Sequence, residues 1–225
     1  MNRKGDQKMY SNEELIKLAE DFVKEELGPD PSGHDWWHCD RVRNLALEIA
    51  KNEQAGADIF ICELAALLHD IADVKLNESK QAGIDKVRNW MQQRIDDKEC
   101  IDKVVTIISS ISYNGGQNKP METIEGQIVQ DADRLDALGA IGIARTFVYS
   151  GWKGQLIHNP EQDFTDKDYR SNGKTAIYHF YEKLLKLKDL MNTNYAKELA
   201  EKRHKFMEEY LNQFYQEWNF KENQP

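Results

Sequence analysis

The sequence predicts a single all-helical domain spanning residues 1–225, and three observations support this. Apolar residues recur at intervals of three and four through most of the 225-residue chain, which is the spacing of one face of an α-helix. No run alternates cleanly between apolar and polar side chains, as a half-buried strand would. Hydrophobic residues make up 40% and charged residues 31% of the chain, a balance typical of a globular protein with a well-charged surface.

The first helices have recognisable starts. Ser11 and Glu14 form a capping box that opens the first helix after a flexible N-terminus over residues 1–10. Asp35 is placed to cap the second helix. The third, near Asp58 to Ile71, is apolar almost all round, as expected at the centre of a fold. Further helices are expected over residues 77–94, 97–112, 123–138 and 140–149.

The second half of the chain contains one long aperiodic segment. Residues 151–173 are polar and contain glycine, which predicts a loop of a length that is often functional or mobile. Two long helices are expected after it, over residues 174–191 and 193–218.

Charge and cysteine content narrow the classes of function. The formal net charge of −9 disfavours a binder of nucleic acid duplexes, although a bound cation would still allow a small anionic substrate. Three separated cysteines without a C-x-x-C pair, and no signal peptide or membrane-spanning run, predict a cytoplasmic protein. In such a protein the glycosylation pattern Asn77-Glu78-Ser79 is expected simply to begin a helix. The oligomeric state stays open, with a homodimer as one option.

Three segments combine histidine or aspartate with an apolar helical context. They are His38-x-x-Arg41-Val42, the string LLHDIAD over residues 67–73, and the string QDADRLDA over residues 130–137. One such histidine alone is more often a core residue, and one such aspartate is usually a cap. A buried carboxylate nevertheless needs a partner, and a single divalent cation would serve all three segments.

The ligand chemistry indicates the kind of ion. Two imidazoles and two carboxylates suit one divalent metal in octahedral geometry, with manganese preferred and Mg, Ni, Co or Fe as alternatives, more than a closed structural zinc. Four protein ligands leave two positions for water and a phosphate oxygen, which is the arrangement that metal-assisted hydrolysis requires.

The ordered set H…HD…D, with His38 in an H-x-x-R-V string, resembles the HD-domain superfamily of metal-dependent phosphohydrolases. The strings GHDW (33–36), ISY (111–113), DADRLDALG (131–139) and KDLMNT (188–193) resemble one bacterial branch, which includes nucleotide pyrophosphohydrolases. The resemblance covers about Ser11 to Trp218. It implies a helical HD-type bundle and a small-molecule nucleotide or phosphate-ester substrate.

Transferred position by position, the resemblance implies four metal ligands. They are His38, His69, Asp70 and Asp133, with Asp131 as the alternative to Asp133. The earlier His34-Asp35 dipeptide is not the family's HD pair, because Asp35 is more simply a helix cap. His34 is expected to line the mouth of the site.

Further roles follow from the resemblance and from position. Asp73 lies about one turn after Asp70 if the helix continues, and it is expected to orient the attacking water. Asp70 and Lys75 complete the catalytic group, with Lys75 reaching a phosphate. The residues expected to bind substrate are His34, Arg41, Arg145, Lys183, Lys188 and Arg203.

The segment at residues 108–113 contains no histidine, where some two-metal relatives place one, and this favours a mononuclear site. The expected reaction is hydrolysis of a nucleoside triphosphate to the monophosphate and pyrophosphate. The alternatives are a nucleoside monophosphate 5'-phosphomonoesterase, a non-catalytic metal- or nucleotide-binding regulatory module, and a helical scaffold without metal.

Overall fold

The computed structural model describes residues 10–28, 33, 35–54, 56–74, 76–113, 115, 121–161 and 175–221. Within these ranges every regular element is helical, which confirms the all-α prediction. None of the described helices is both long enough and apolar enough to cross a membrane. The predicted flexible N-terminus falls almost entirely outside these residues.

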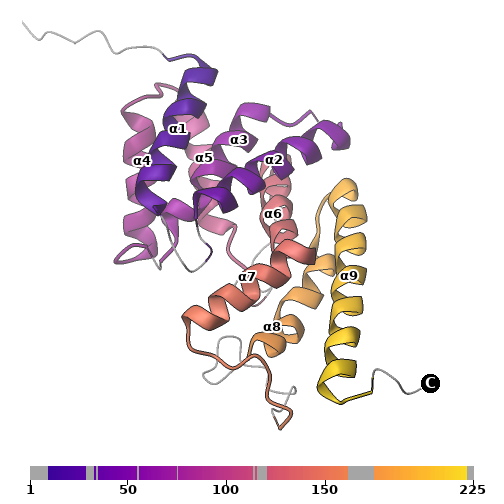
Figure 1. The fold of residues 1–225 in the computed structure, drawn as a ribbon. Coiled ribbons are helices and arrows are strands. Elements are labelled where there is room, and N and C mark those ends of the chain that lie inside the picture. The colour runs from indigo at the N-terminus through magenta and orange to yellow at the C-terminus, as the bar shows by residue number, and fades with distance from the viewer. Residues whose placement is uncertain are drawn as a thin grey trace, which may run out of the picture. The chain divides into compact units, whose positions relative to one another are not determined.

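The first compact unit comprises residues 1–30 and 34–132. Its elements are α1 (Asn12–Leu27), α2 (Trp36–Glu53), α3 (Ile59–Leu68), the short 3-10 helix η1 (His69–Ala72), α4 (Lys80–Gln92), α5 (Lys98–Ser110) and the start of α6 (Ile124–Asp136) (Figure 1). Helix α3 packs against α1, α2 and α5. Leu64, Leu67 and Leu68 of α3 are fully buried, as expected for the central helix.

Side-chain caps start these helices where the sequence predicts them. The hydroxyl of Ser11 accepts from the backbone N–H of Glu14, and the Glu14 carboxylate accepts from the N–H of Ser11. Asp35 caps α2 and Asp58 caps α3 in the same manner. Helix α4 starts later than predicted, at Lys80, because Ser79 provides its cap.

The predicted third helix is α-helical only as far as Leu68. Helix α3 tightens into η1 at His69, and η1 ends at Ala72. Asp73 is extended, with φ −66° and ψ 137°, and its N–H donates to the carbonyl of Asp70 three residues before it. Asp73 therefore follows the helical segment instead of lying one turn along it.

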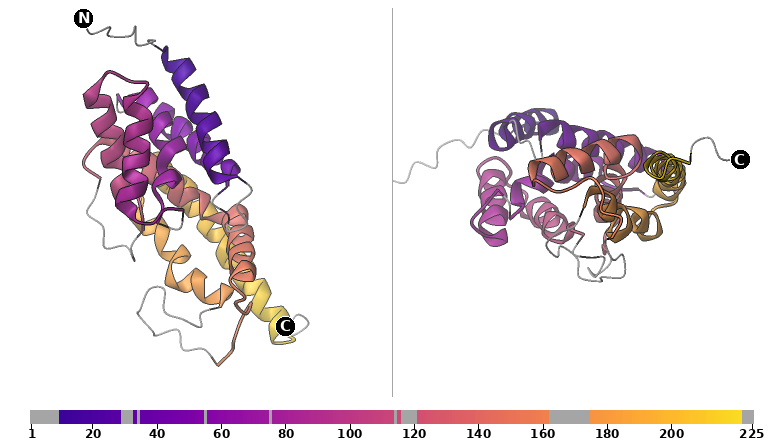
Figure 2. Two further views of the ribbon diagram at one scale, coloured as in Figure 1. Left: turned by 90° about the vertical axis from the view of Figure 1, so that its left-hand side faces the viewer. Right: turned by 60° about the horizontal axis from the view of Figure 1, so that its bottom comes forward.

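The second unit comprises residues 31–33 and 133–225. It contains the end of α6, α7 (Gly139–Trp152), α8 (Ala176–Glu182), the 3-10 helix η3 (Leu184–Leu190) and α9 (Asn194–Trp218). Helix α9 runs beside α7 and η3 (Figure 2). The boundary between the units falls within the continuous helix α6 rather than in an exposed linker, where domains usually divide. A single domain over residues 1–225 stays a prediction.

The predicted long helix over residues 174–191 is instead two segments. Lys183, with φ −131° and ψ −61°, separates α8 from η3. In η3 the buried residues Leu184 and Leu187 are three positions apart, which is the repeat of a 3-10 helix. Burial of these two leucines on one face favours the 3-10 helix over the wider α-helix.

The predicted loop over residues 151–173 begins later than expected, because α7 continues to Trp152. Its described part is held against the start of α8. The N–H groups of Ala176 and Ile177 donate to the carbonyls of Leu156 and Ile157, each at 3.0 Å. Residues 162–174 lie outside the described part of the chain.

Candidate metal centre

His38 is placed by the first turn of α2. The Asp35 carboxylate accepts a hydrogen bond from the backbone N–H of His38 at 2.8 Å, which satisfies an amide that a helix start leaves without an intrahelical partner. His38 is 1% exposed and lies one turn before the buried Val42. The cap therefore fixes the backbone that carries a buried imidazole.

His69 begins η1, and a backbone carbonyl orients its ring. Nδ1 lies 2.8 Å from the carbonyl oxygen of Ala66. A carbonyl only accepts, so Nδ1 carries the proton and the neutral ring keeps its lone pair on Nε2. That Nε2 lies 3.2 Å from Nε2 of His38. Outer support of this kind is typical of metal-ligating histidines.

Asp70 brings a carboxylate to both rings. Its Oδ2 lies 3.4 Å from Nε2 of His38, and its Oδ1 lies 3.3 Å from Nε2 of His69. Asp70 is 6% exposed, and a buried carboxylate needs a compensating positive charge. A cation between these three side chains would provide such a charge.

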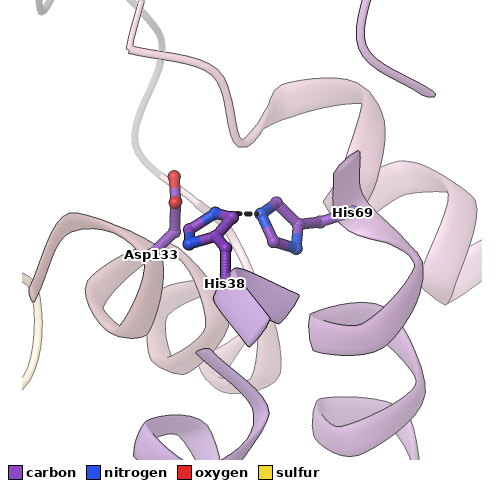
Figure 3. A group of neighbouring side chains, drawn as sticks. All are labelled: His38, His69 and Asp133. Atoms are coloured by element: carbon purple, nitrogen blue, oxygen red, sulfur yellow. Dashed lines mark hydrogen bonds between the residues drawn. The ribbon is translucent and has the colours of Figure 1, made fainter. Parts of the chain in front are cut away.

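Asp133 completes the group. It lies on α6, whose residues up to Ala132 belong to the first unit. One oxygen of Asp133 and one ring nitrogen each of His38 and His69 lie within 4.8 Å of one another (Figure 3). Asp131, two residues earlier, is fully buried and is not a member of this group.

This set of side chains fits a divalent cation. Two nitrogen ligands at right angles around one ion, with bonds of about 2.1 Å, lie about 3.0 Å apart. The two Nε2 atoms are separated by 3.2 Å. Mixed imidazole and carboxylate ligands suit Mn, Fe, Co or Ni. Among the described residues, His38, His69 and Asp133 are gathered in a way that could hold the ion, and the Asp70 carboxylate lies beside both rings without being a member of that group.

Of the other predicted site residues in the first unit, two lie within the described part of the chain. Asp73 is half-buried directly after η1. Arg41 is half-buried on α2, three residues after His38. His34 and Lys75 lie outside the described residues.

Arg145 of α7 contacts groups of its own unit. Its Nη1 donates to Oδ2 of Asp136 at 2.8 Å, and its Nη2 donates to the carbonyl of Gly33 at 2.9 Å. Asp136 is 2% exposed, so the guanidinium compensates a buried charge. Asp136 is not among the predicted site residues. Its sequence signals are its place in the DADRLDALG string and its position about one helical turn after Asp133.

The other basic residues predicted to bind substrate also lie in the second unit. Arg203 donates to the carbonyl of Leu135 and packs against Gly139, whose φ of +72° favours glycine. A Cβ at that glycine would lie 3.2 Å from Cγ of Arg203. Lys188 pairs with Glu201 at 3.3 Å, which raises the pKa of that ammonium group. Lys183 is half-buried at the end of α8.

The cysteines add no reactive group. All three are buried and free. Burial, assisted by nearby carboxylates, raises the pKa of Cys62 to about 12 and that of Cys100 to about 11. These two thiols stay protonated at neutral pH and are poor nucleophiles.

Comparison with known proteins defines the class to which this helical fold and its histidine–aspartate group belong. Residues 36–138 match the HD domain family, and this segment contains His38, the His69-Asp70 pair and Asp133. The chain belongs to the HD-domain superfamily, whose solved members include hydrolases.

Individual relatives are similar over nearly the whole chain. YpgQ of Bacillus subtilis is 43% identical over 203 residues, covering 88% of this chain and 92% of YpgQ. A crystal structure of YpgQ in complex with ADP gives a TM-score of 0.71 at 40% identity, over 90% of this chain and 97% of that one. An HD-superfamily hydrolase from Bacillus thuringiensis gives a TM-score of 0.74 at 48% identity, over 93% and 99%. The similarity therefore extends well beyond the HD segment.

Proposed function

We propose that this protein is a metal-dependent phosphohydrolase that converts nucleoside triphosphates to monophosphates and pyrophosphate. The observation that carries the proposal is the group of His38, His69 and Asp133, whose ligand atoms lie within 4.8 Å of one another, with the Asp70 carboxylate beside both rings. The nucleotide is supported by the complex of the relative YpgQ with ADP.

The proposed cofactor is one divalent ion, with Mn²⁺ preferred. When bound, such an ion lowers the pKa of a coordinated water and offsets charge on a phosphoryl group. The protein's contribution starts with His69, whose Nδ1–H contact to Ala66 keeps the Nε2 lone pair directed toward His38. Asp70 supplies negative charge beside both rings.

Asp73 is the proposed catalytic carboxylate that orients the water. Water attacks the α-phosphorus, the bond from that phosphorus to the bridging oxygen breaks, and pyrophosphate leaves. The proton lost by the water passes to Asp73 and then to solvent. The position of Asp73, directly after the turn that carries Asp70, supports this role.

The substrate phosphates need positive charge. From the first unit we propose Arg41 and Lys75, with His34 at the mouth of the site. From the second unit we propose Lys183, Lys188, Arg145 and Arg203. The contacts of Arg145 with Asp136 and of Arg203 with Leu135 also give these two arginines a structural role.

A cytoplasmic location also belongs to the proposal. It is supported by the three cysteines, which are all buried and free, as is usual in a reducing compartment.

Product analysis tests the reaction. Metal-depleted protein is supplied with Mn²⁺ and, separately, with dATP, dADP or dAMP, and both pyrophosphate and orthophosphate are measured. The expected result is that dATP is converted to pyrophosphate and dAMP in equal amounts. Orthophosphate from dAMP would indicate a monophosphatase instead, and binding without turnover would indicate a regulatory module. His69→Ala serves as the control for a contaminating phosphatase.

A further inference from the structure

Asn77 lies in the first unit, in the segment between η1 and α4. Its side-chain Nδ2 donates to the carbonyl oxygens of Ile71 at 2.8 Å and of Asp73 at 2.9 Å. An amide nitrogen has two N–H groups, so both are used. One side chain therefore holds the last turn of η1 and the residue that follows it.

Backbone hydrogen bonds close the same turn. The N–H of Asp73 donates to the carbonyl of Asp70 at 3.0 Å, and the N–H of Leu76 donates to the carbonyl of Asp73 at 3.1 Å. The carbonyl of Asp73 thus accepts from both Leu76 and Asn77. With its N–H and its carbonyl both engaged, the backbone of Asp73 has a fixed orientation, and so does the bond to its side chain.

Gly83 of α4 leaves the space that the Asn77 amide occupies. A Cβ at this position would lie 2.7 Å from Nδ2 of Asn77, 2.8 Å from Cα of Ala72 and 2.9 Å from the carbonyl oxygen of Ala72. Separations this short are repulsive between carbon and other heavy atoms. Glycine is therefore required for α4 to approach η1 this closely.

We propose that Asn77 is a positioning residue that orients Asp73, and that Gly83 is needed to seat it. This inference rests on the proposed function, in which Asp73 orients the attacking water. The asparagine of the Asn77-Glu78-Ser79 pattern thus ties together the backbone behind the catalytic carboxylate, and α4 begins only after Ser79. His69 has its own support from Ala66, so loss of the Asn77 contacts affects turnover more than metal binding.

The first test is made on metal-free protein and is independent of activity. Asn77→Asp keeps the side-chain shape but places a carboxylate against two carbonyl oxygens, and Gly83→Ala displaces the amide. Hydrogen exchange of the peptide over residues 70–77 is expected to accelerate about 10-fold or more in both variants. The control is Asn52→Asp, an exposed amide that donates to the carbonyl of Glu48 at 2.8 Å in α2, and it should leave this peptide unchanged. Unaltered exchange in Asn77→Asp would overturn the proposal.

The second test separates positioning from general loss of structure. For Asn77→Asp, kcat is expected to fall about 10- to 100-fold, with KM and Mn²⁺ affinity within about 3-fold of wild type. In protein that already carries Asp73→Asn, adding Asn77→Asp should lower kcat by less than about 3-fold further, because the effect of Asn77 passes through Asp73. Additive losses, or an equal loss of Mn²⁺ affinity, would show a merely structural role and overturn the proposal.

The outcomes also separate this inference from the function on which it rests. A wild-type protein without Mn²⁺-dependent hydrolysis would refute the proposed function, while hydrogen exchange would still decide whether Asn77 holds the turn. Full kcat in Asp73→Asn would remove the role of Asp73 and the positioning role with it. A slow Asp73→Asn combined with a fully active Asn77→Asp would refute the positioning role alone.

Discussion

Both units of the molecule bury histidines, and His69 of the first unit and His158 of the second have opposite surroundings. In the first unit, Nδ1 of His69 lies 2.8 Å from the carbonyl of Ala66 and its Nε2 lies 3.2 Å from that of His38. In the second unit, Nδ1 of His158 is buried and has no hydrogen-bond partner within the described structure. One ring has polar neighbours at both nitrogens, while the other leaves a buried nitrogen unsatisfied.

Aromatic side chains explain how His158 is accommodated. The rings of Phe214, Tyr215 and Trp218 on α9 lie edge-on to it, with centroid distances of 5.8, 5.6 and 4.9 Å. The imidazole therefore acts as one more ring of an aromatic cluster. Burial alone does not identify a metal ligand. What distinguishes His69 is a tautomer fixed by a backbone carbonyl and a second nitrogen that meets other ligand atoms.

The largest expected effect comes from exchanging the two histidines for other residues in turn. His69→Ala removes a proposed ligand, and hydrolysis should fall by at least about 1,000-fold with loss of bound Mn²⁺. His158→Phe keeps an aromatic ring in the cluster and should retain activity within about 3-fold. Activity assays and elemental analysis check both. Metal loss in His158→Phe, or full activity in His69→Ala, would contradict the contrast between the two rings.

A second pair of variants compares the two aspartates on α6. Asp133→Asn should weaken Mn²⁺ binding by more than about 100-fold, because a neutral amide replaces a charged ligand. Asp131→Asn should leave Mn²⁺ affinity nearly unchanged and lower the Tm instead, since Asp131 is fully buried. Titration calorimetry and thermal unfolding measure the two effects. The reverse result would make Asp131 the ligand.

The sequence predicts the features that depend on neighbouring residues. The caps Ser11 and Asp35 act within three positions, so their geometry follows from the local sequence. His69 and Asp70 stand out because two polar residues end an otherwise apolar helix.

Features set by tertiary contacts were not predictable in this way. The Ala66 carbonyl that orients His69 has no side-chain signature. The end of η1 at Ala72 depends on the amide of Asn77 and on close approach by Gly83. The change to 3-10 winding after Lys183 depends on burial of leucines against the rest of their unit.

Arg145 shows how the second unit uses its charges. If its main role is to compensate the buried Asp136, Arg145→Ala should destabilise the protein by about 2 kcal/mol. The double variant with Asp136→Asn should recover much of that loss, because no uncompensated charge remains. Urea unfolding measures stability, and KM is determined for each variant. An unchanged free energy of unfolding with a raised KM would instead favour substrate binding by Arg145.

The smallest expected effect is the pH dependence contributed by His158. Burial lowers the pKa of this imidazole, so the folded protein favours the neutral ring. The unfolded chain takes up a proton as the pH falls through the ordinary histidine pKa of about 6.5. Stability contributed by His158 is thus fully present above that pH and is lost as the pH falls toward the folded-state pKa.

Urea unfolding at pH 7.5 and pH 5.5 measures this contribution when wild type and His158→Phe are compared. The variant cannot titrate at this position and should lose less stability between the two values. The contributions of all other titratable groups are common to both proteins and cancel in the difference. Equal losses would show that His158 is as readily protonated in the folded cluster as in water, and the proposed contrast between the two buried rings would then rest on the ligand geometry of His69 alone.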